Sequence, residues 1–330
     1  MYEIKENFNV GALTTFKVDA KAKYYVVIQN LDDIEKLFRE IKQSGLPYFF
    51  LGGGSNTLFN SAGYNGWVIN LMADQIETDE NLFDVEAGCD LNKLIKTSIK
   101  AGYAGLHKLI GIPGTVAGAI RGNAGAFGQS ISSFVKEVLF FDCQRLNFGS
   151  LDYKQCHFQY RQSVFSTKKH FLILRARLEL KQKATSKLDQ EIKQIKQQRK
   201  NMIHYKFPSA GSVFKNIPLE QIKKNPHYQG VQGEKELKKL IKEYYYDRDL
   251  KKQNQKISDI KVIPAGYLIE KVGLAGRIIG RAEIPQEHCN VIYNLGKATS
   301  NEIIQLMSFA KARVRDEYGI LLNEELVFVS

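Results

Sequence analysis

The chain has 330 residues, of which 44% are hydrophobic, and it carries a formal net charge of +12. The length is sufficient for two domains, and the hydrophobic content excludes a disordered protein. No segment resembles a signal peptide or approaches the length of a membrane span, so we expect a cytoplasmic protein without a membrane partner. The four cysteines are scattered and form no CxxC pair, which indicates unpaired thiols and no metal site.

The positive charge would suit an anionic partner, such as a nucleic acid or a nucleotide-bearing metabolite. Most of the excess, however, is lysine spread over predicted helix faces, where such charges keep a protein soluble. The tyrosine triplet Tyr244–Tyr246 has the chemistry to stack on bases, but a packed helix face is the preferred interpretation. We therefore expect no nucleic-acid partner.

The first half of the chain alternates between predicted strands and helices. The β-branched run at 23–29 predicts a strand, and Asn30 and Gly45 mark the two ends of an amphipathic helix. A strand predicted at 170–180 alternates from Leu172 onward, with its leucines on one face. Apolar runs predict further strands at 47–51, 67–70, 82–87 and 135–142, and a helix at 91–101.

The second half begins with a long polar helix predicted at 186–201. We place the domain boundary at its start, so that the first domain spans 1–185 and the second spans 186–330. A compact loop follows at 208–216, and then a lysine-rich, largely helical segment at 217–262. The remaining predicted elements are a short helix at 265–272, a strand at 290–294, a helix opened by the capping box of Thr299 and Glu302, and a final strand at 320–329.

Two glycine-rich stretches are the strongest chemical signal. The stretch from Ile110 to Gly128 is crowded with glycine and alanine, and the sequence GGGSN at 52–56 follows a predicted strand. Glycine lets bare peptide N–H groups approach an anion closely, so we favour a ligand cradle over tight packing. The spacing matches neither the Rossmann pattern GxGxxG nor the P-loop pattern GxxxxGKS. Two such loops together could clamp a diphosphate.

Six motifs occur in a fixed order along the chain. They are LGGGSNTLF at 51–59, IPGTVAGAIRGNAGAFG at 112–128, YR at 160–161, AGSVFKN at 210–216, AGYLIEKVGLAGRIIG at 265–280, and a terminal LNEEL. With them the chain resembles the UDP-N-acetylenolpyruvoylglucosamine reductases (UDP-N-acetylmuramate dehydrogenases), flavoenzymes of bacterial cell-wall synthesis. The resemblance covers nearly the whole chain apart from 217–262.

The resemblance implies an α+β fold with a two-subdomain FAD-binding lobe of the vanillyl-alcohol-oxidase (PCMH) type and a C-terminal α/β substrate lobe. It implies FAD as cofactor and NADPH as co-substrate. The implied reaction reduces UDP-N-acetylglucosamine enolpyruvate to UDP-N-acetylmuramate for peptidoglycan synthesis, and we expect a monomer. The residues implied to hold the flavin are Gly52, Gly53, Gly54, Ser55, Asn56, Pro113, Gly114, Thr115, Asn123, Ala124 and Gly125.

The same resemblance assigns three catalytic residues. Arg161 would polarise the substrate carboxylate, Ser212 would deliver a proton, and Glu325 would complete that site. Glu324 leaves the register open on the residues alone, and we choose Glu325 because it stands two residues after Asn323, as the family's glutamate does. The implied substrate contacts are Tyr160, Lys215, Asn216 and, as a weaker match, His288.

Each of these residues also has an ordinary structural interpretation, such as a surface ion pair for Arg161 or a turn for Ser212. Two other functions compete: an FAD-dependent oxidase or dehydrogenase acting on a free sugar or alcohol, and a basic nucleic-acid-binding protein on a degenerate flavoprotein scaffold. The chain departs from the family pattern at Val327, where an arginine is usual, and at Asp19-Ala20, where a glycine pair is usual. We expect the segment 217–262 to form a lid or rim over the UDP group.

Overall fold

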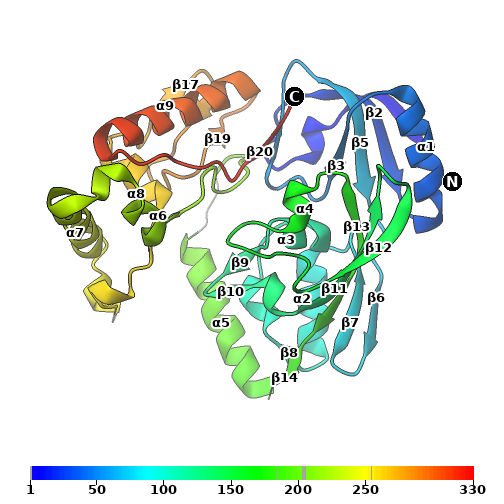
Figure 1. Ribbon diagram of the computed structural model, residues 1–330, viewed down its shortest axis with the longest axis horizontal. Coiled ribbons are helices and arrows are strands. Elements are labelled where there is room, and N and C mark those ends of the chain that lie inside the picture. Colours follow the sequence, from blue (N-terminus) through cyan, green and yellow to red (C-terminus); the bar gives the residue numbers. More distant parts are fainter. Residues whose placement is uncertain (1, 184, 203–205, 254) are drawn as a thin grey trace. The chain divides into compact units, whose positions relative to one another are not determined.

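The computed structural model describes residues 2–183, 185–202, 206–253 and 255–330. The chain forms two compact units (Figure 1). The second unit takes two short segments from the N-terminal part of the chain as well as the C-terminal part. The first unit comprises Met1–Leu13, Ala20–Ser55 and Ala62–Lys206, and the second comprises Thr14–Asp19, Asn56–Ser61 and Phe207–Ser330.

The first unit begins with a four-stranded sheet in the order β1-β2-β5-β3. Strand β5 (Tyr64–Leu71) lies parallel to both β2 (Lys21–Ile28) and β3 (Tyr48–Leu51), and β1 (Ile4–Asn9) is antiparallel to β2. Helix α1 (Ile34–Ser44) follows a short 3-10 turn that Asn30 caps, and Gly45 ends it with a φ of 64°. The helix buries Ile34, Leu37, Phe38 and Ile41, as its apolar spacing predicts.

A five-stranded antiparallel sheet forms the other part of this unit, in the order β12-β11-β13-β7-β6 (Figure 1). Leu174, Ala176 and Leu178 of β13 are buried and alternate with Arg175 and Arg177, as predicted. At the start of the strand the predicted alternation fails, because Ile173 is buried as well as Leu172. Helix α3 packs on β13, and both sheets contribute to one hydrophobic core. The bounds are β6 (Ile76–Asp79), β7 (Leu82–Glu86), β11 (Val135–Asp142), β12 (Asn147–Asp152), β13 (Phe171–Glu179), α2 (Leu91–Lys100), α3 (Val116–Arg121) and α4 (Val164–Thr167). The expected two-subdomain flavin-type lobe is therefore confirmed.

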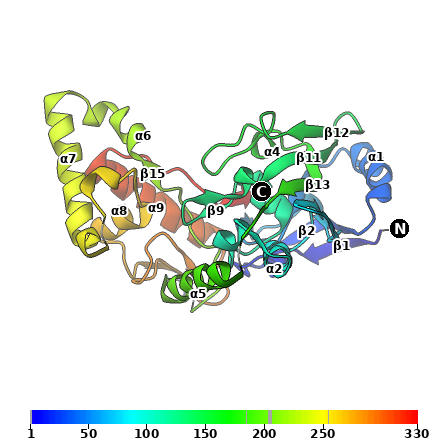
Figure 2. The same cartoon turned by 90° about the horizontal axis from the view of Figure 1, so that it is seen from below.

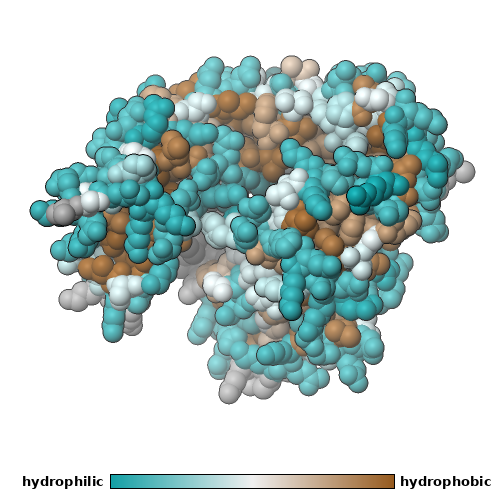
Figure 3. Space-filling view, in the orientation of Figure 1, coloured by the Kyte–Doolittle hydropathy of each residue, from teal (hydrophilic) through white to brown (hydrophobic). Residues whose placement is uncertain are grey.

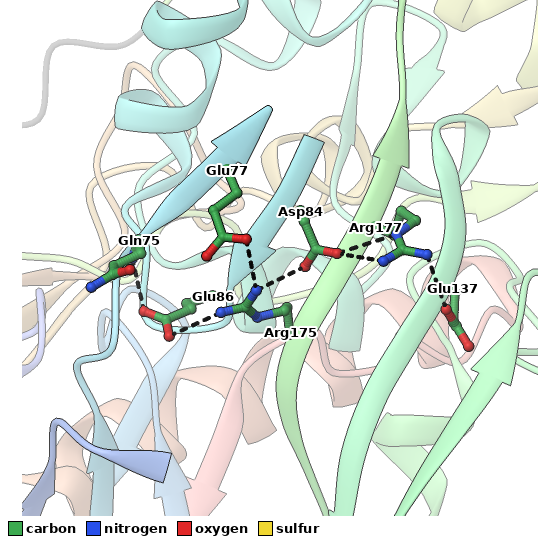
Figure 4. A network of polar contacts seen from close by, with 7 residues as sticks. All are labelled: Gln75, Glu77, Asp84, Glu86, Glu137, Arg175 and Arg177. Carbon is green, nitrogen blue, oxygen red and sulfur yellow. Dashed lines mark hydrogen bonds and ion pairs between the residues drawn. The ribbon is translucent and has the colours of Figure 1, made fainter. Parts of the chain in front are cut away.

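The opposite face of the second sheet carries a network of charges (Figure 4). Arg177 is the cross-strand neighbour of Asp84 on β7 and of Glu137 on β11, and it donates to Asp84 over 2.9 Å. Arg175 lies among Glu77, Asp84 and Glu86 at 3.4–3.5 Å. A register slip of one residue would turn these charges into the core, so the network helps to fix the pairing of the strands.

Helix α5 (Thr185–Met202) belongs to the first unit, so the units divide after Lys206, later than the boundary expected at 185–186. The side chain of His107 explains part of this attachment. His107 is 3% exposed, accepts a hydrogen bond from Gly105 N at Nδ1, and contacts Glu191 of α5 through Nε2 at 3.0 Å. Lys183 also binds Glu191, at 2.5 Å. Nearby short strands are β8 (Tyr103–Ala104) paired with β14 (Lys181–Gln182), and β9 (Gly125–Ala126) paired with β10 (Gln129–Ser130).

The second unit has its own hydrophobic core, in which α9 (Ser300–Tyr318) packs against α8 (Ala265–Lys271) and a small three-stranded sheet. Thr299 and Glu302 form the predicted capping box of α9. The predicted final strand is wrong for most of its length, because only Val327–Val329 (β20) pairs in a ladder, with β4 (Thr57–Phe59). The predicted strand at 290–294 is likewise reduced to Tyr293–Asn294 (β19). The other two strands of the small sheet are β17 (Ile278–Ile279) and β18 (Ala282–Glu283).

The lysine-rich segment folds into the core of this unit. It begins and ends at the pair β15 (Ile217–Pro218) and β16 (Val262–Ile263), and between them lie α6 (Leu219–Lys223) and α7 (Gly230–Asp247). Helix α7 lies beside α8 (Figure 2). The ring of Tyr244 on α7 packs edge-on against that of Tyr267 on α8, with 5.1 Å between the ring centroids. Tyr244 is half-buried, Tyr245 is buried, and only Tyr246 of the triplet is largely exposed, so the packed-face interpretation is confirmed.

The surface shown in Figure 3 is mostly polar, as expected for a protein that buries its apolar residues in two cores. The apolar residues on this face lie in separate groups. Within the described ranges, no helix is both long and apolar enough to cross a bilayer. The cysteines Cys89, Cys143, Cys156 and Cys289 are all buried as free thiols, as the sequence predicts.

The histidine that anchors α5 gives a pH-dependent prediction. Burial lowers the pKa of His107 below its usual value of 6.5, although Glu191 acts in the opposite direction. Around the usual pKa of 6.5 the unfolded chain therefore binds more protons than the folded chain, and stability should rise as the pH rises through this value. We expect His107→Gln to flatten the dependence of unfolding free energy on pH, measured by denaturant titration. Leu109→Ala, which destabilises the same segment without removing a titrating group, should keep the wild-type slope; a wild-type slope in His107→Gln would contradict the account.

Candidate functional site

The two glycine-rich loops of the first unit touch each other through bare backbone. A Cβ added to Gly53 would lie 2.7 Å from Cα of Gly114, and one added to Gly52 would lie 2.8 Å from Oγ1 of Thr115. Ser55 Oγ donates a hydrogen bond of 3.0 Å to the carbonyl of Pro113. Only glycine permits such an approach, so the stretches expected to clamp a diphosphate form one continuous surface.

A cavity of about 70 Å³ opens beside this contact. Its walls are largely apolar and come from β3, β5, β13 and α3. Four residues add polar or bare backbone groups: Gly52, Thr115, Gly118 and Arg121. An apolar slot beside a glycine cradle fits a flavin nucleotide, whose flat rings require apolar walls and whose diphosphate requires N–H donors. By this fit, Gly52–Ser55 and Pro113–Thr115 would hold the diphosphate of FAD.

The third expected flavin segment, Asn123–Gly125, is bonded to the predicted catalytic arginine. Asn123 is 8% exposed, and its Nδ2 donates to the carbonyl of Gln159 at 2.8 Å. Gln159 and Gln162 exchange backbone hydrogen bonds of 2.9 and 3.2 Å, which closes a tight turn with Tyr160 and Arg161 at its tip. Arg161 adopts a φ of 54° and donates from Nη1 to the carbonyl of Gly125 at 3.1 Å. The arginine is thus held against the backbone of a flavin-type loop.

Tyr160 lies next to this arginine and is 48% exposed. The guanidinium of Arg161 lies 5.6 Å from the centre of the Tyr160 ring, within the range of a cation–π interaction. Ala124 is part of the same loop, and its N–H donates to the carbonyl of Ala119 at 2.8 Å. The contacts therefore bring Tyr160, Arg161 and the segment from Asn123 to Gly125 together.

In the second unit, Ser212 lies on an extended segment fixed from both sides. Asn290 holds one side: its Oδ1 accepts from Phe214 N at 3.0 Å, and its Nδ2 donates to the carbonyl of Phe214 at 2.8 Å. On the other side, Glu325 N donates to the carbonyl of Val213 at 2.9 Å. Ser212 is half-buried beside these clamped residues. The serine and the glutamate predicted to be catalytic are therefore on adjacent, hydrogen-bonded segments.

The contacts also distinguish the two neighbouring glutamates. Glu324 is exposed, and its carboxylate pairs with Lys311 of α9 at 3.1 Å. Glu325 is half-buried, and its carbonyl accepts a hydrogen bond of 2.8 Å from Nδ2 of Asn56. Glu325 is therefore the less exposed of the two glutamates. Asn56 is expected to be a flavin contact. Its side-chain amide also orders the segment of Glu325 through this hydrogen bond.

The remaining expected substrate contacts are distributed around the serine segment. Lys215 is half-buried, and in the part of the chain that the structure describes its ammonium has no carboxylate partner. Asn216 Oδ1 accepts from Ala265 N at 3.2 Å, so it fixes the start of α8. His288 is exposed, two residues before Asn290. Val327, at the position of the family's arginine, pairs with Thr57 in the β20–β4 ladder.

The sequence analysis gave no role to Arg121, which lines the cavity. It stands inside the glycine-rich stretch, where a single charge among small residues was the available signal. The sequence analysis also gave no role to Asn290. Its clamp on Phe214 depends on a contact between distant parts of the chain, which no local pattern reveals.

The contact between the glycine loops gives a stability prediction. We expect Gly53→Ala to destabilise the protein by about 1–3 kcal/mol, because its methyl group would overlap the backbone of Gly114. Gly122→Ala is the matched control, since its Cβ would meet Gly118 O at an ordinary 3.5 Å. The control should change stability by no more than about 0.5 kcal/mol. Chemical unfolding of the FAD-free protein measures both, and equal stabilities for the two variants would refute the close contact.

Comparison with known proteins agrees with this site. The model described as "UDP-N-acetylenolpyruvoylglucosamine reductase, C-terminal domain" matches residues 203–329, and the model described as "FAD binding domain" matches residues 22–144.

Similar proteins named UDP-N-acetylenolpyruvoylglucosamine reductase occur in Anoxybacillus flavithermus (30% identical, covering 99% of this chain and 94% of the relative) and in Borreliella burgdorferi (30% identical, covering 97% and 93%). The crystal structure of UDP-N-acetylenolpyruvylglucosamine reductase from Thermus caldophilus is 25% identical, covers 100% of this chain and 99% of its own, and superposes with a TM-score of 0.69. This chain belongs to the UDP-N-acetylenolpyruvoylglucosamine reductase family.

Proposed function

We propose that this protein reduces UDP-N-acetylglucosamine enolpyruvate to UDP-N-acetylmuramate, with FAD as cofactor and NADPH as the source of hydride. The observation that carries the proposal is the pairing of the Ser212 segment with the Glu325 segment through the bond from Glu325 N to Val213 O. Membership of the reductase family supports the same reaction. The product is a precursor of peptidoglycan.

The reaction adds a hydride and a proton across the carbon–carbon double bond of the enolpyruvyl ether. FAD, which Gly52–Ser55 and Pro113–Thr115 would hold, would supply the redox chemistry that carries a hydride from NADPH to the β-carbon of the substrate. The electron pair of the double bond then moves toward the carboxylate, which needs a nearby cation, and the α-carbon needs a proton. The protein must therefore supply a fixed positive charge and an acid.

Arg161 is proposed as the fixed charge. Its guanidinium is permanently protonated and can present two N–H groups to a carboxylate. The bond from its Nη1 to Gly125 O and the turn closed by Gln159 and Gln162 restrict its position, which supports a preorganised role. Tyr160 would stack beside it and limit the access of water.

Ser212 is proposed as the acid that protonates the α-carbon. A serine hydroxyl is a weak acid in water, so it must act against a strongly basic enolate and with hydrogen-bond partners. Glu325 would orient the serine hydroxyl, or the group that returns a proton to it after the reaction. Its backbone is hydrogen-bonded to Val213, the residue after Ser212. Lys215 and Asn216 would contact the diphosphate or carboxylate of the substrate, and His288 would lie at its edge.

Several finer points are also proposals. We propose that the protein acts as a monomer in the cytoplasm, where NADPH and nucleotide sugars are available. The lid role of 217–262 remains a hypothesis, and the packing of α7 on α8 means that its deletion would also expose apolar core. The two competing functions have less support, since no contact of the tyrosine triplet favours nucleic acid and the reductase motifs are distinct from those of sugar oxidases.

The proposed acid is tested by Ser212→Ala. Reduction of the bound flavin by NADPH should continue at its normal rate, because that step needs no substrate proton. Reoxidation by the enolpyruvyl sugar should slow by about 10²–10⁴-fold, as expected for the loss of a general acid. Stopped-flow absorption of the flavin separates the two half-reactions.

Ser209→Ala is the matched control for this experiment. Ser209 lies in the same loop, is 6% exposed, and has no role in the proposed chemistry. It should leave both half-reactions within about twofold of wild type. Normal reoxidation in Ser212→Ala would remove this serine from the mechanism.

A further inference from the structure

Arg121 is an arginine in an unusual setting within the first unit. It is the last residue of α3, and its side chain lines the cavity beside Gly52 and Thr115. Its Nη1 donates to the carbonyl of Phe165 at 2.8 Å. Across residues 2–183, 185–202, 206–253 and 255–330, no carboxylate pairs with its guanidinium. Burial lowers the pKa of Arg121, which reflects a charge withdrawn from water.

Arg175 is another partly buried arginine of this protein, and its charge is paired. Its side chain is 25% exposed and lies among Glu77, Asp84 and Glu86, which neutralise it (Figure 4). A buried charge without a counter-ion is costly, so proteins generally pair it. Arg121 lacks such a pair and faces a cavity, which indicates that its counter-ion is a ligand.

The position of Arg121 defines the chemistry of that ligand. The cavity has apolar walls for a flat ring, while Gly52 and Thr115 of the glycine loops line the same space. Peptide N–H groups offer only partial positive charges, whereas a nucleoside diphosphate carries formal negative charges. A guanidinium adds a full charge and two parallel N–H donors.

We propose that Arg121 binds the diphosphate of the flavin nucleotide and is a principal determinant of FAD affinity. The proposal rests on FAD being the cofactor, and it does not depend on the identity of the reduced substrate. Arg121 is then an affinity residue within the cofactor site, separate from the chemistry at Arg161 and Ser212. Without the ligand the unpaired charge destabilises the folded protein, and the negative charge of the bound diphosphate removes this destabilisation.

The test compares ligands that share only part of FAD. FAD, ADP, adenosine and UDP are titrated into flavin-free protein by calorimetry, for wild type, Arg121→Met and Arg121→Lys. Arg121→Met should lower the affinity for FAD and for ADP by about tenfold to a hundredfold, as expected for the loss of a hydrogen bond from a charged donor. Adenosine, which lacks phosphate, should bind all three proteins equally. Arg121→Lys keeps the positive charge but loses the two parallel N–H donors of the guanidinium. Its affinity for FAD and ADP should therefore fall by an intermediate factor.

Arg145→Met is the matched control for net charge. The Arg145 side chain is 80% exposed and lies outside the cavity, so this variant should bind all four ligands as wild type does. A second readout is thermal unfolding. The flavin-free Arg121→Met protein should be at least as stable as wild type, and FAD should raise its midpoint by less. If Arg121→Met does not fold, Arg121→Lys carries the comparison alone.

Three outcomes would overturn the proposal. Unchanged affinities for all four ligands would make Arg121 merely structural. An equal loss for ADP and adenosine would assign it to the adenine ring. A loss confined to UDP would assign it to the diphosphate of the nucleotide sugar instead of the cofactor. None of these results would bear on whether the reductase reaction occurs, which is measured separately.

Discussion

The backbone contact between Gly53 and Gly114 is the constraint on which the flavin-type lobe depends. Gly53 follows β3 of the four-stranded sheet, and Gly114 precedes α3, which packs on the five-stranded sheet. With side chains at these positions the two loops could not approach each other through bare backbone. The cavity lies beside this approach, and Gly52 and Thr115 contribute to both.

Asparagine side chains then convert loops into defined sites. Asn123 fixes the turn that carries Arg161, Asn290 clamps the segment that carries Ser212, and Asn56 orders the segment of Glu325. In each case the amide bonds to backbone, so the position of the catalytic candidate is set by its main chain. Such support is what a preorganised site requires, because the reacting groups themselves must remain available to substrate.

Much of the fold was predictable because its core elements have strong periodicity. Helix α1 and strand β13 bury the side chains that their spacing indicates. The edge strands β1 and β12 were not predicted, since their residues are mostly polar and are recognised only through their partners. The stretch before Val327 was predicted as strand but bonds to loop segments instead of a ladder, as Glu325 does with Val213. The glycine motifs indicated the site, whereas Arg121 required the packing around it to be known.

The central claim is that this protein passes hydride from NADPH to an enolpyruvyl sugar through FAD. The most direct measurement is the visible absorption spectrum of the FAD-loaded protein under anaerobic conditions, recorded after NADPH and again after UDP-N-acetylglucosamine enolpyruvate. The account predicts a flavin band that bleaches with NADPH and returns with the enolpyruvyl sugar. A band that bleaches and stays bleached would assign the activity to another acceptor, and a protein that binds no FAD would contradict the account of the glycine loops.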